Sequence, residues 1–359
     1  MQVMRTTILA LAAMIATLGS PLAAAAAFQD PLTVPAQASA LASRSLLQGV
    51  ARAGQRLVAV GQRGHIVHST DGGASWQQAK VPVSSDLTAV FFANERKGWA
   101  VGHDGVILAT TDGGLNWTLQ FDGHRANDRL IQHLEQRVKD QPQAADLKTL
   151  LDEARRYKEQ GADKPFLGLW FADENNGWVV GAYNLIFRTA DGGKTWEPWF
   201  DRTDNPKLLN LYGIAQAGDG LYVVGESGLV MRLDPTSQRF LAKPTPYKGS
   251  FFGVVGSPSG VLVFGLRGNA YAGDATGSNW QKVEAGLPAT IVAAAALPDG
   301  ALLLADASGR VALSSPAGRD FKPVVLKPAM PLAGIADAGG GRVALVGPRG
   351  VAVTALPSN

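Results

Sequence analysis

The sequence predicts an all-β fold built from repeated small sheets, and three observations lead to it. A short phrase, Asp-Gly-Gly followed by tryptophan three residues later, occurs at Asp71–Trp76, Asp112–Trp117 and Asp191–Trp196. Similar apolar segments return at a spacing of about 40 residues, which is typical of propeller blades or solenoid units. The 42 glycines and 20 prolines suit short strands joined by tight turns.

Each repeat starts with a short apolar strand. The starts of these strands are Leu46, Leu87, Phe166, Leu208, Phe251, Ile291 and Leu332, which makes seven repeats. A second strand that ends in a glycine turn follows, as in Gly98–Gly102 and Gly177–Gly181, and then a third and a fourth strand. Four antiparallel strands in each of seven units predict a seven-bladed β-propeller, which we expect to extend over residues 28–359.

The last repeat ends at Val351–Thr354 and has no fourth strand of its own. The segment Phe28–Pro35 resembles Trp76–Pro82, because in both an aromatic residue precedes a Val-Pro pair. We therefore expect the N-terminal strand to complete the last blade and to close the ring, which would cover its open edges. The alternative is a disordered N-terminal tail.

The repeated phrase has a structural explanation. Its aspartate can accept backbone N–H groups in the turn between the third and fourth strands, and its glycines allow positive φ. Its tryptophan can bury a large ring against a neighbouring sheet. We therefore predict structural rather than catalytic roles for Asp71, Trp76, Asp112, Trp117, Asp191 and Trp196.

Residues 1–27 have the pattern of a cleaved secretory signal peptide. Arg5 precedes the apolar run Ile8–Leu18, and small residues continue to Ala27. This pattern predicts a periplasmic or otherwise exported protein, and the alternative is an uncleaved membrane anchor. The absence of cysteine excludes disulfides and thiolate metal sites. The formal charge of +3 gives no reason to expect nucleic acid as a partner, and scattered histidines give none to expect a metal or cofactor.

Residues 121–165 interrupt the repeat between blades 2 and 3. Apolar residues at helical spacing predict one helix in Asp128–Lys139 and a second in Ala144–Gln160, which together form a helical hairpin. Antiparallel strand order places this insertion on the same face as the glycine turns. A long insertion in a compact repeat fold is often functional, and the alternative is a hairpin that only packs on the propeller flank.

The glycine turns carry the candidate partner-binding residues Arg63, Arg267, Arg349 and Tyr183. The first and last blades adjoin, so we expect Arg63 and Arg349 to lie close together. Two arginines in this arrangement can pair with an acidic side chain or a C-terminal carboxylate of a partner protein. The alternative is that these arginines are merely solvated. His103 and Asp104 occupy the equivalent turn of the second blade.

The first strands offer no charged residue at the positions that would face the ring centre. Gln48, Thr88, Gly168 and Asn210 occupy four of these positions. A glycoside hydrolase needs two carboxylates that face one pocket, so we predict no enzyme activity. A secreted, sialidase-like glycoside hydrolase is the alternative function. A carbohydrate-binding module, with Tyr183 as its exposed aromatic residue, is a third interpretation.

The repeated phrases are Asp-box, or BNR, repeats. Together with the strands Gly98–Gly102 and Gly177–Gly181, they make the chain resemble the photosystem II stability and assembly factor propellers over Leu46–Thr354. This resemblance implies a non-enzymatic scaffold, without cofactors, that helps to assemble a membrane protein complex. The partner would be a subunit of such a complex, in photosynthesis or in another envelope system, and we expect the scaffold to be a monomer.

Overall fold

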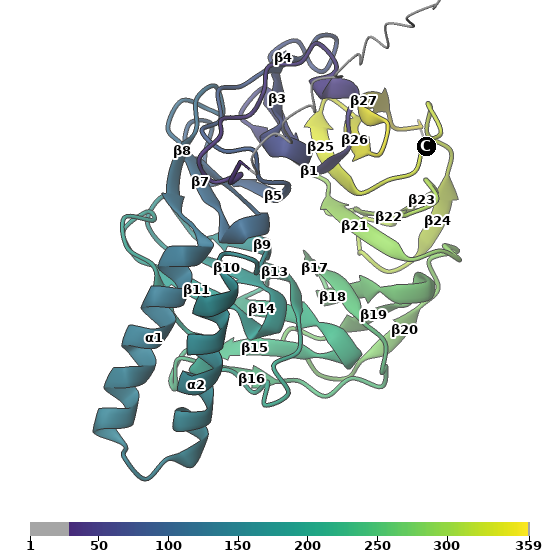
Figure 1. The fold of residues 1–359 in the computed structure, drawn as a ribbon. Coiled ribbons are helices and arrows are strands. Elements are labelled where there is room, and N and C mark those ends of the chain that lie inside the picture. The colour runs from purple at the N-terminus through teal and green to yellow at the C-terminus, as the bar shows by residue number, and fades with distance from the viewer. Residues whose placement is uncertain (1–28, 358–359) are drawn as a thin grey trace, which may run out of the picture.

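The computed structural model describes residues 29–357 as seven small antiparallel sheets arranged in a ring, which confirms the seven-bladed propeller (Figure 1). The predicted signal peptide, residues 1–27, lies outside the described residues, as does Phe28. Within each sheet the strands follow one another in chain order. The first strand of each blade packs beside the first strands of its neighbours around the axis.

Blades 1 to 4 each have four strands. Blade 1 contains β1 (Leu47–Ala53), β2 (Arg56–Gly61), β3 (Ile66–Ser69) and β4 (Gln77–Gln78). Blade 2 contains β5 (Leu87–Phe92), β6 (Gly98–Gly102), β7 (Ile107–Thr110) and β8 (Thr118–Phe121). Blade 3 contains β9 (Phe166–Phe171), β10 (Gly177–Gly181), β11 (Ile186–Thr189) and β12 (Glu197–Pro198). Blade 4 contains β13 (Leu211–Ala217), β14 (Gly220–Gly225), β15 (Val230–Asp234) and β16 (Arg239–Ala242).

Blades 5 and 6 also have four strands, whereas blade 7 has three in the described part of the chain. Blade 5 contains β17 (Phe251–Ser257), β18 (Gly260–Gly265), β19 (Ala270–Gly273) and β20 (Gln281–Val283). Blade 6 contains β21 (Ile291–Ala296), β22 (Leu302–Asp306), β23 (Val311–Ser314) and β24 (Phe321–Val324). Blade 7 contains β25 (Gly334–Gly339), β26 (Arg342–Gly347) and β27 (Gly350–Ala355).

Short 3-10 turns and two α-helices connect these strands. The 3-10 turns are η1 (Ala42–Arg44), η2 (Gln62–Gly64), η3 (His103–Gly105), η4 (Ala182–Asn184), η5 (Phe200–Arg202), η6 (Glu226–Gly228) and η7 (Leu266–Gly268). The helices are α1 (Gly123–Asp140) and α2 (Ala145–Gln160). No helix among residues 29–357 combines the length and the apolar character that a membrane span needs.

The N-terminal segment does not complete blade 7, so this prediction was wrong. The segment lies along blade 1 instead, where the Ala36 N–H donates to Val81 O (3.1 Å) and the Ser84 N–H donates to Pro31 O (2.9 Å). Its side chains Leu32 and Ala36 pack on the apolar cluster between blades 1 and 2. Burying these groups there favours the observed route over pairing with the last blade.

Direct packing of blade 7 on blade 1 closes the ring. Arg52 of β1 forms an ion pair with Asp337 of β25, with Nη1 and Oδ2 3.1 Å apart. Arg342 of β26 donates to the main-chain oxygen of Gly72 (3.1 Å). The closure therefore depends on side-chain contacts between two sheets and not on a sheet shared by both chain ends.

In each Asp-box turn, the aspartate stabilises the backbone conformation by accepting hydrogen bonds. Asp112 Oδ1 accepts the N–H groups of Leu115 and Asn116, each at 3.0 Å, and the Thr110 hydroxyl at 2.8 Å. Gly113 and Gly114 have φ of 74° and 92°, which few other residues adopt without strain. Trp117 is buried, and its Nε1–H donates to Gly114 O (3.1 Å). Asp71 and Asp191 accept the same main-chain bonds, from Ser75 and Thr195.

Replacing Asp112 by alanine should lower the free energy of unfolding by about 2 kcal/mol, because it removes a charged acceptor of several hydrogen bonds. Burial raises the pKa of Asp112, but hydrogen bonds from Asn116 and Thr110 outweigh this effect and lower the pKa to about 2. The stabilisation should therefore be complete above about pH 4 and be lost as the pH falls towards 2. Urea unfolding at pH 7 and pH 3 measures both effects. Equal losses at the two pH values would contradict this explanation.

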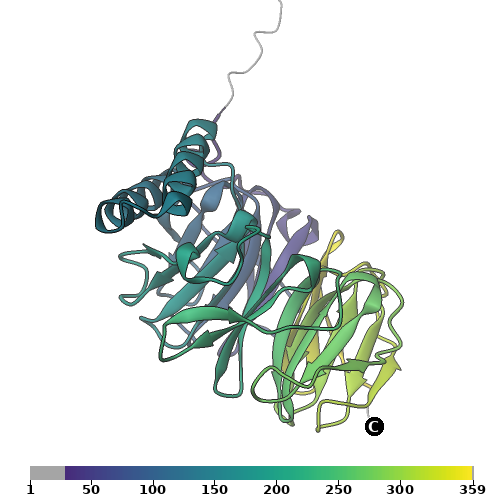
Figure 2. The same cartoon turned by 90° about the horizontal axis from the view of Figure 1, so that it is seen from below.

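The insertion forms the predicted hairpin, which projects from the rim beside blades 2 and 3 (Figures 1 and 2). Helix α1 begins at Gly123, five residues before the predicted start, because Asp122 caps it by accepting the Arg125 N–H (3.0 Å). The two helices pack through Leu130, Leu134, Leu147 and Leu151, which join the core of blades 2 and 3. Because Gly123 lies against Gly105 in η3, the hairpin starts on the face of the glycine turns, as predicted.

Candidate partner-binding face

The turns between the second and third strands form one face of the ring, which we call the turn face. In five blades the middle residue of this turn has positive φ without being glycine, namely Arg63, Asp104, Tyr183, Ser227 and Arg267. This conformation is unfavourable for bulky residues. Side chains of the next blade stabilise three of these turns. The Arg63 N–H donates to Asp86 Oδ1 and the Tyr183 N–H to Asn210 Oδ1, each at 2.7 Å, and the Arg267 N–H donates to the Thr290 hydroxyl at 3.4 Å.

A hollow of about 710 Å³ lies on this face at blade 1. The N-terminal segment forms one wall and the η2 turn forms the other, with Arg44, Arg63 and His65 among the lining residues. No acidic side chain from the described part of the chain lines the hollow. Burial, followed by the charge of Arg63, lowers the pKa of His65, and its Nδ1 lies 3.0 Å from the Ser45 hydroxyl. The cationic groups of the hollow at neutral pH are therefore the two exposed arginines.

Arg349, which we predicted to lie close to Arg63, does not line this hollow. It lies in the turn before β27, and the following residue, Gly350, packs against Ser43 and Arg44. Arg44 therefore contacts the last blade through Gly350 and also lines the hollow of blade 1. Within residues 29–357, no ion pair involves the guanidinium of Arg44, Arg63 or Arg349.

The structure does not bring all the predicted site residues together. Arg267 is exposed in the η7 turn of blade 5, and Tyr183 is 56% exposed in the η4 turn of blade 3. Neither residue lines the hollow of blade 1. Tyr183 instead faces the hairpin, with its ring centroid 6.2 Å from that of Tyr157 and 5.7 Å from Lys164 Nζ. His103 is exposed in the η3 turn, beside Asp104.

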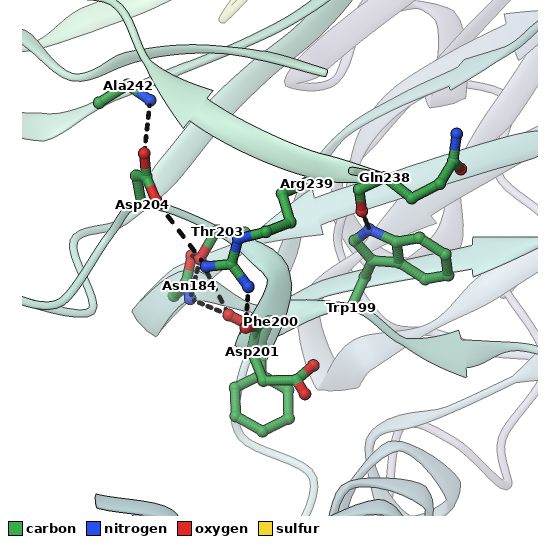
Figure 3. A network of polar contacts seen from close by, with 9 residues as sticks. All are labelled: Asn184, Trp199, Phe200, Asp201, Thr203, Asp204, Gln238, Arg239 and Ala242. Carbon is green, nitrogen blue, oxygen red and sulfur yellow. Dashed lines mark hydrogen bonds and ion pairs between the residues drawn. The ribbon is translucent and has the colours of Figure 1, made fainter. Parts of the chain in front are cut away.

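A buried ion pair joins the hairpin to blade 3. The Asp201 side chain is 3% exposed, and its Oδ2 contacts Arg137 and lies 3.1 Å from His133 Nε2. On its other side the main chain of Asp201 accepts a hydrogen bond from Arg239 (3.2 Å), which also approaches Asp204 (Figure 3). This network joins η5 to α1 and so anchors the hairpin on blade 3.

The described residues include no group of three or more His, Asp or Glu side chains that could hold a metal ion. The carboxylate of Glu226 lies on the turn face, but it accepts hydrogen bonds from the main chain and side chain of Asn210 and from the Tyr212 hydroxyl. Arg44 and Arg63, which line the same hollow, are instead suited to binding an anionic group by charge-assisted hydrogen bonds.

Comparisons with solved structures identify the same fold. "YCF48 bound to D1 peptide" matches with a TM-score of 0.61 and 15% identity, over 88% of this chain and 95% of that chain. "YCF48 from Cyanidioschyzon merolae" matches with a TM-score of 0.62 and 15% identity, over 88% and 97%. The WD40 propeller domain of Doa1 matches with a TM-score of 0.62 but 9% identity, over 92% and 97%. These likenesses show the propeller fold.

The sequence itself carries the family assignment. No curated protein matches the chain in sequence. The family described as "Photosynthesis system II assembly factor YCF48" matches residues 40–130 and 155–301, and the gap between these ranges falls within the helical hairpin. Because the match extends over more than half of the chain, the protein belongs to the family of photosynthesis system II assembly factor YCF48.

Proposed function

We propose that the protein is an exported, non-enzymatic scaffold that binds a carboxylate-bearing segment of a membrane protein subunit on its turn face. The observation that carries this proposal is the pair Arg44 and Arg63, which lines a hollow that has no carboxylate from residues 29–357. Arg349 lies next to Gly350, which packs against Arg44. Arginines without ion-pair partners keep their hydrogen-bonding capacity for a partner. A side-chain carboxylate and a C-terminal carboxylate both meet this requirement.

Family membership supports the class of partner. A structurally similar YCF48 is described as bound to a D1 peptide. A peptide-binding propeller that assists assembly fits a chain whose N-terminal residues 1–27 have the pattern of a signal peptide. We therefore place the protein in the periplasm or another exported compartment, with a subunit of an envelope complex as its partner.

The alternative of a glycoside hydrolase requires two carboxylates that face one pocket and are available to a substrate. Among the described residues, no carboxylate lines the hollow at Arg44 and Arg63. Three carboxylates line another hollow on the turn face, but each already has a partner: Glu153 contacts Arg156, Asp163 contacts Lys164 and Glu226 accepts a hydrogen bond from Asn210. A fluorogenic sialoside assay should detect no hydrolysis above the buffer control. Hydrolysis that survives purification to homogeneity would contradict the scaffold.

The double substitution Arg63→Ala and Arg349→Ala should reduce capture of the partner subunit from solubilised envelope membranes by at least about tenfold. Each lost charge-assisted hydrogen bond weakens binding by about this factor. Quantitative mass spectrometry of the captured proteins measures the effect. The matched control is Arg267→Ala, since Arg267 has the same turn position and conformation on blade 5, away from the hollow. Equal capture by the double variant and the parent protein would contradict the proposal.

A further inference from the structure

Blade 7 ends in an edge strand of an unusual kind for this protein. The outer strands of the other six blades have two to four residues, whereas β27, the outermost strand of blade 7, has six. Strand β27 pairs with β26 along its whole length without a bulge. Its sequence, GVAVTA, contains no charged residue and no proline. Proteins usually protect an open edge with such residues, with bulges or with short strands.

The outward edge of β27 offers regularly spaced backbone groups. The Leu356 N–H donates to Gly341 O (2.8 Å) and so points towards β26. Because successive N–H groups of a strand alternate in direction, those of Val351, Val353 and Ala355 point away from β26. Within residues 29–357, no backbone hydrogen bond joins β27 to any segment other than β26. Four of the six residues are partly exposed and Ala355 is exposed.

The described ends of this chain lie elsewhere. Residues of the N-terminal segment bond to blade 1, as the Ala36 and Ser84 contacts show. The η1 turn packs against Gly350 at the start of β27, and Val351 joins the apolar cluster that contains Ala42. After Ala355, Leu356 stays bonded on the β26 side. The position of a fourth strand in blade 7 is therefore not taken by residues 29–357.

The direction of β27 indicates which end of a partner would meet the arginines. Strand β27 starts at the turn face, directly after Arg349 and beside Arg44, and runs away from that face. In all six complete blades the fourth strand is antiparallel to the third. An antiparallel strand added to β27 therefore ends at the turn face, with its C-terminal carboxylate near Arg349 and Arg44.

We infer that the edge of β27 accepts the C-terminal segment of the partner protein as the fourth strand of blade 7. Backbone hydrogen bonds to Val351, Val353 and Ala355 hold the segment, and the arginines bind its terminal carboxylate. This inference rests on the proposed function for the identity of the partner, but the edge itself can be tested separately. It also accounts for the absence of charge and proline in β27.

The test measures binding of a ten-residue peptide of alternating threonine and valine, with a free C-terminal carboxylate, to the purified protein. Amide hydrogen exchange followed by NMR should slow at Val351, Val353 and Ala355 when the peptide is added. The same peptide with an amidated C-terminus should bind at least about tenfold more weakly. Unchanged exchange at β27, or equal binding of the two peptides, would overturn the inference.

The matched variants are Ala355→Pro and Ala355→Val. Proline removes the outward N–H at the exposed end of β27 and leaves the bonds to β26, so the affinity for the free-acid peptide should fall about fivefold. The Ala355→Val variant keeps this N–H, so its affinity for the free-acid peptide should equal that of the parent protein. Equal affinity of both variants would contradict the added strand. Gel filtration provides a second check, because a dimer with protected β27 amides in the absence of peptide would assign the edge to a second copy.

These outcomes separate the inference from the proposed function. If the Arg63→Ala, Arg349→Ala variant lost capture of the membrane subunit while Ala355→Pro captured it normally, the proposed function would be supported and strand addition to β27 would be contradicted. If the peptide bound at β27 but the protein captured no membrane subunit, strand addition to β27 would be supported and the proposed function would be contradicted.

Discussion

Replacing Trp99 by alanine is expected to lower the free energy of unfolding by about 3–5 kcal/mol, the largest effect of any single substitution considered for this protein. Trp99 of β6 is fully buried, and its ring lies nearly parallel to that of Phe171 in β9 with centroids 3.5 Å apart. The two rings join blades 2 and 3, so removing one of them opens a cavity between sheets that the backbone cannot fill.

Equilibrium unfolding in urea measures this loss. Trp99→Phe is the conservative variant, because it keeps an aromatic ring and removes a buried Nε1–H that has no partner among the described residues. It should cost less than about 1.5 kcal/mol. Trp280→Ala, at a partly exposed tryptophan of blade 5, should also cost clearly less than Trp99→Ala. If all three variants lost the same stability, packing between blades 2 and 3 would not be the cause.

The blades could be predicted from the sequence because their signals are local. Asp112 and Trp117 lie five residues apart in the chain, and the bonds that they form stay within one turn. The route of the N-terminus could not be predicted in this way. It depends on whether Leu32 and Ala36 bury more apolar surface on blade 1 than on blade 7, and the likeness of Phe28–Pro35 to an outer strand does not measure that difference.

The candidate site was predicted in part for the same reason. Arg63 and Arg349 were predicted from the glycine turns, and of these two Arg63 lines the hollow. Arg44, which also lines it, was not predicted because its position there depends on the route of the N-terminal segment. The anchor of the hairpin was also missed. His133 and Arg137 are four residues apart and so share one face of α1, which indicates an acidic partner but does not identify Asp201.

Replacing Asp201 by asparagine is expected to lower the free energy that holds the hairpin on blade 3 by about 3 kcal/mol. Removing the charge of Asp201 leaves the guanidinium of Arg137, which contacts it, without charge compensation. Amide exchange of α1 and α2 should become faster, while exchange in the strands of blades 4 to 7 should stay unchanged. Asp204→Asn is the matched control, since its carboxylate is 43% exposed and lies 3.8 Å from Arg239. It should change exchange little.

The same anchor should weaken in acid. Burial acts to raise the pKa of Asp201, but the contact with His133 and the charges of His133 and Arg137 outweigh it and hold the pKa below its ordinary value. A carboxylate with a lowered pKa stabilises the folded state fully above about pH 4, and this contribution is lost as the pH falls through the folded-state value. The parent protein should therefore approach the exchange behaviour of Asp201→Asn below pH 4. An equal difference between the two proteins at pH 7 and at pH 2 would show that the charge of Asp201 does not anchor the hairpin.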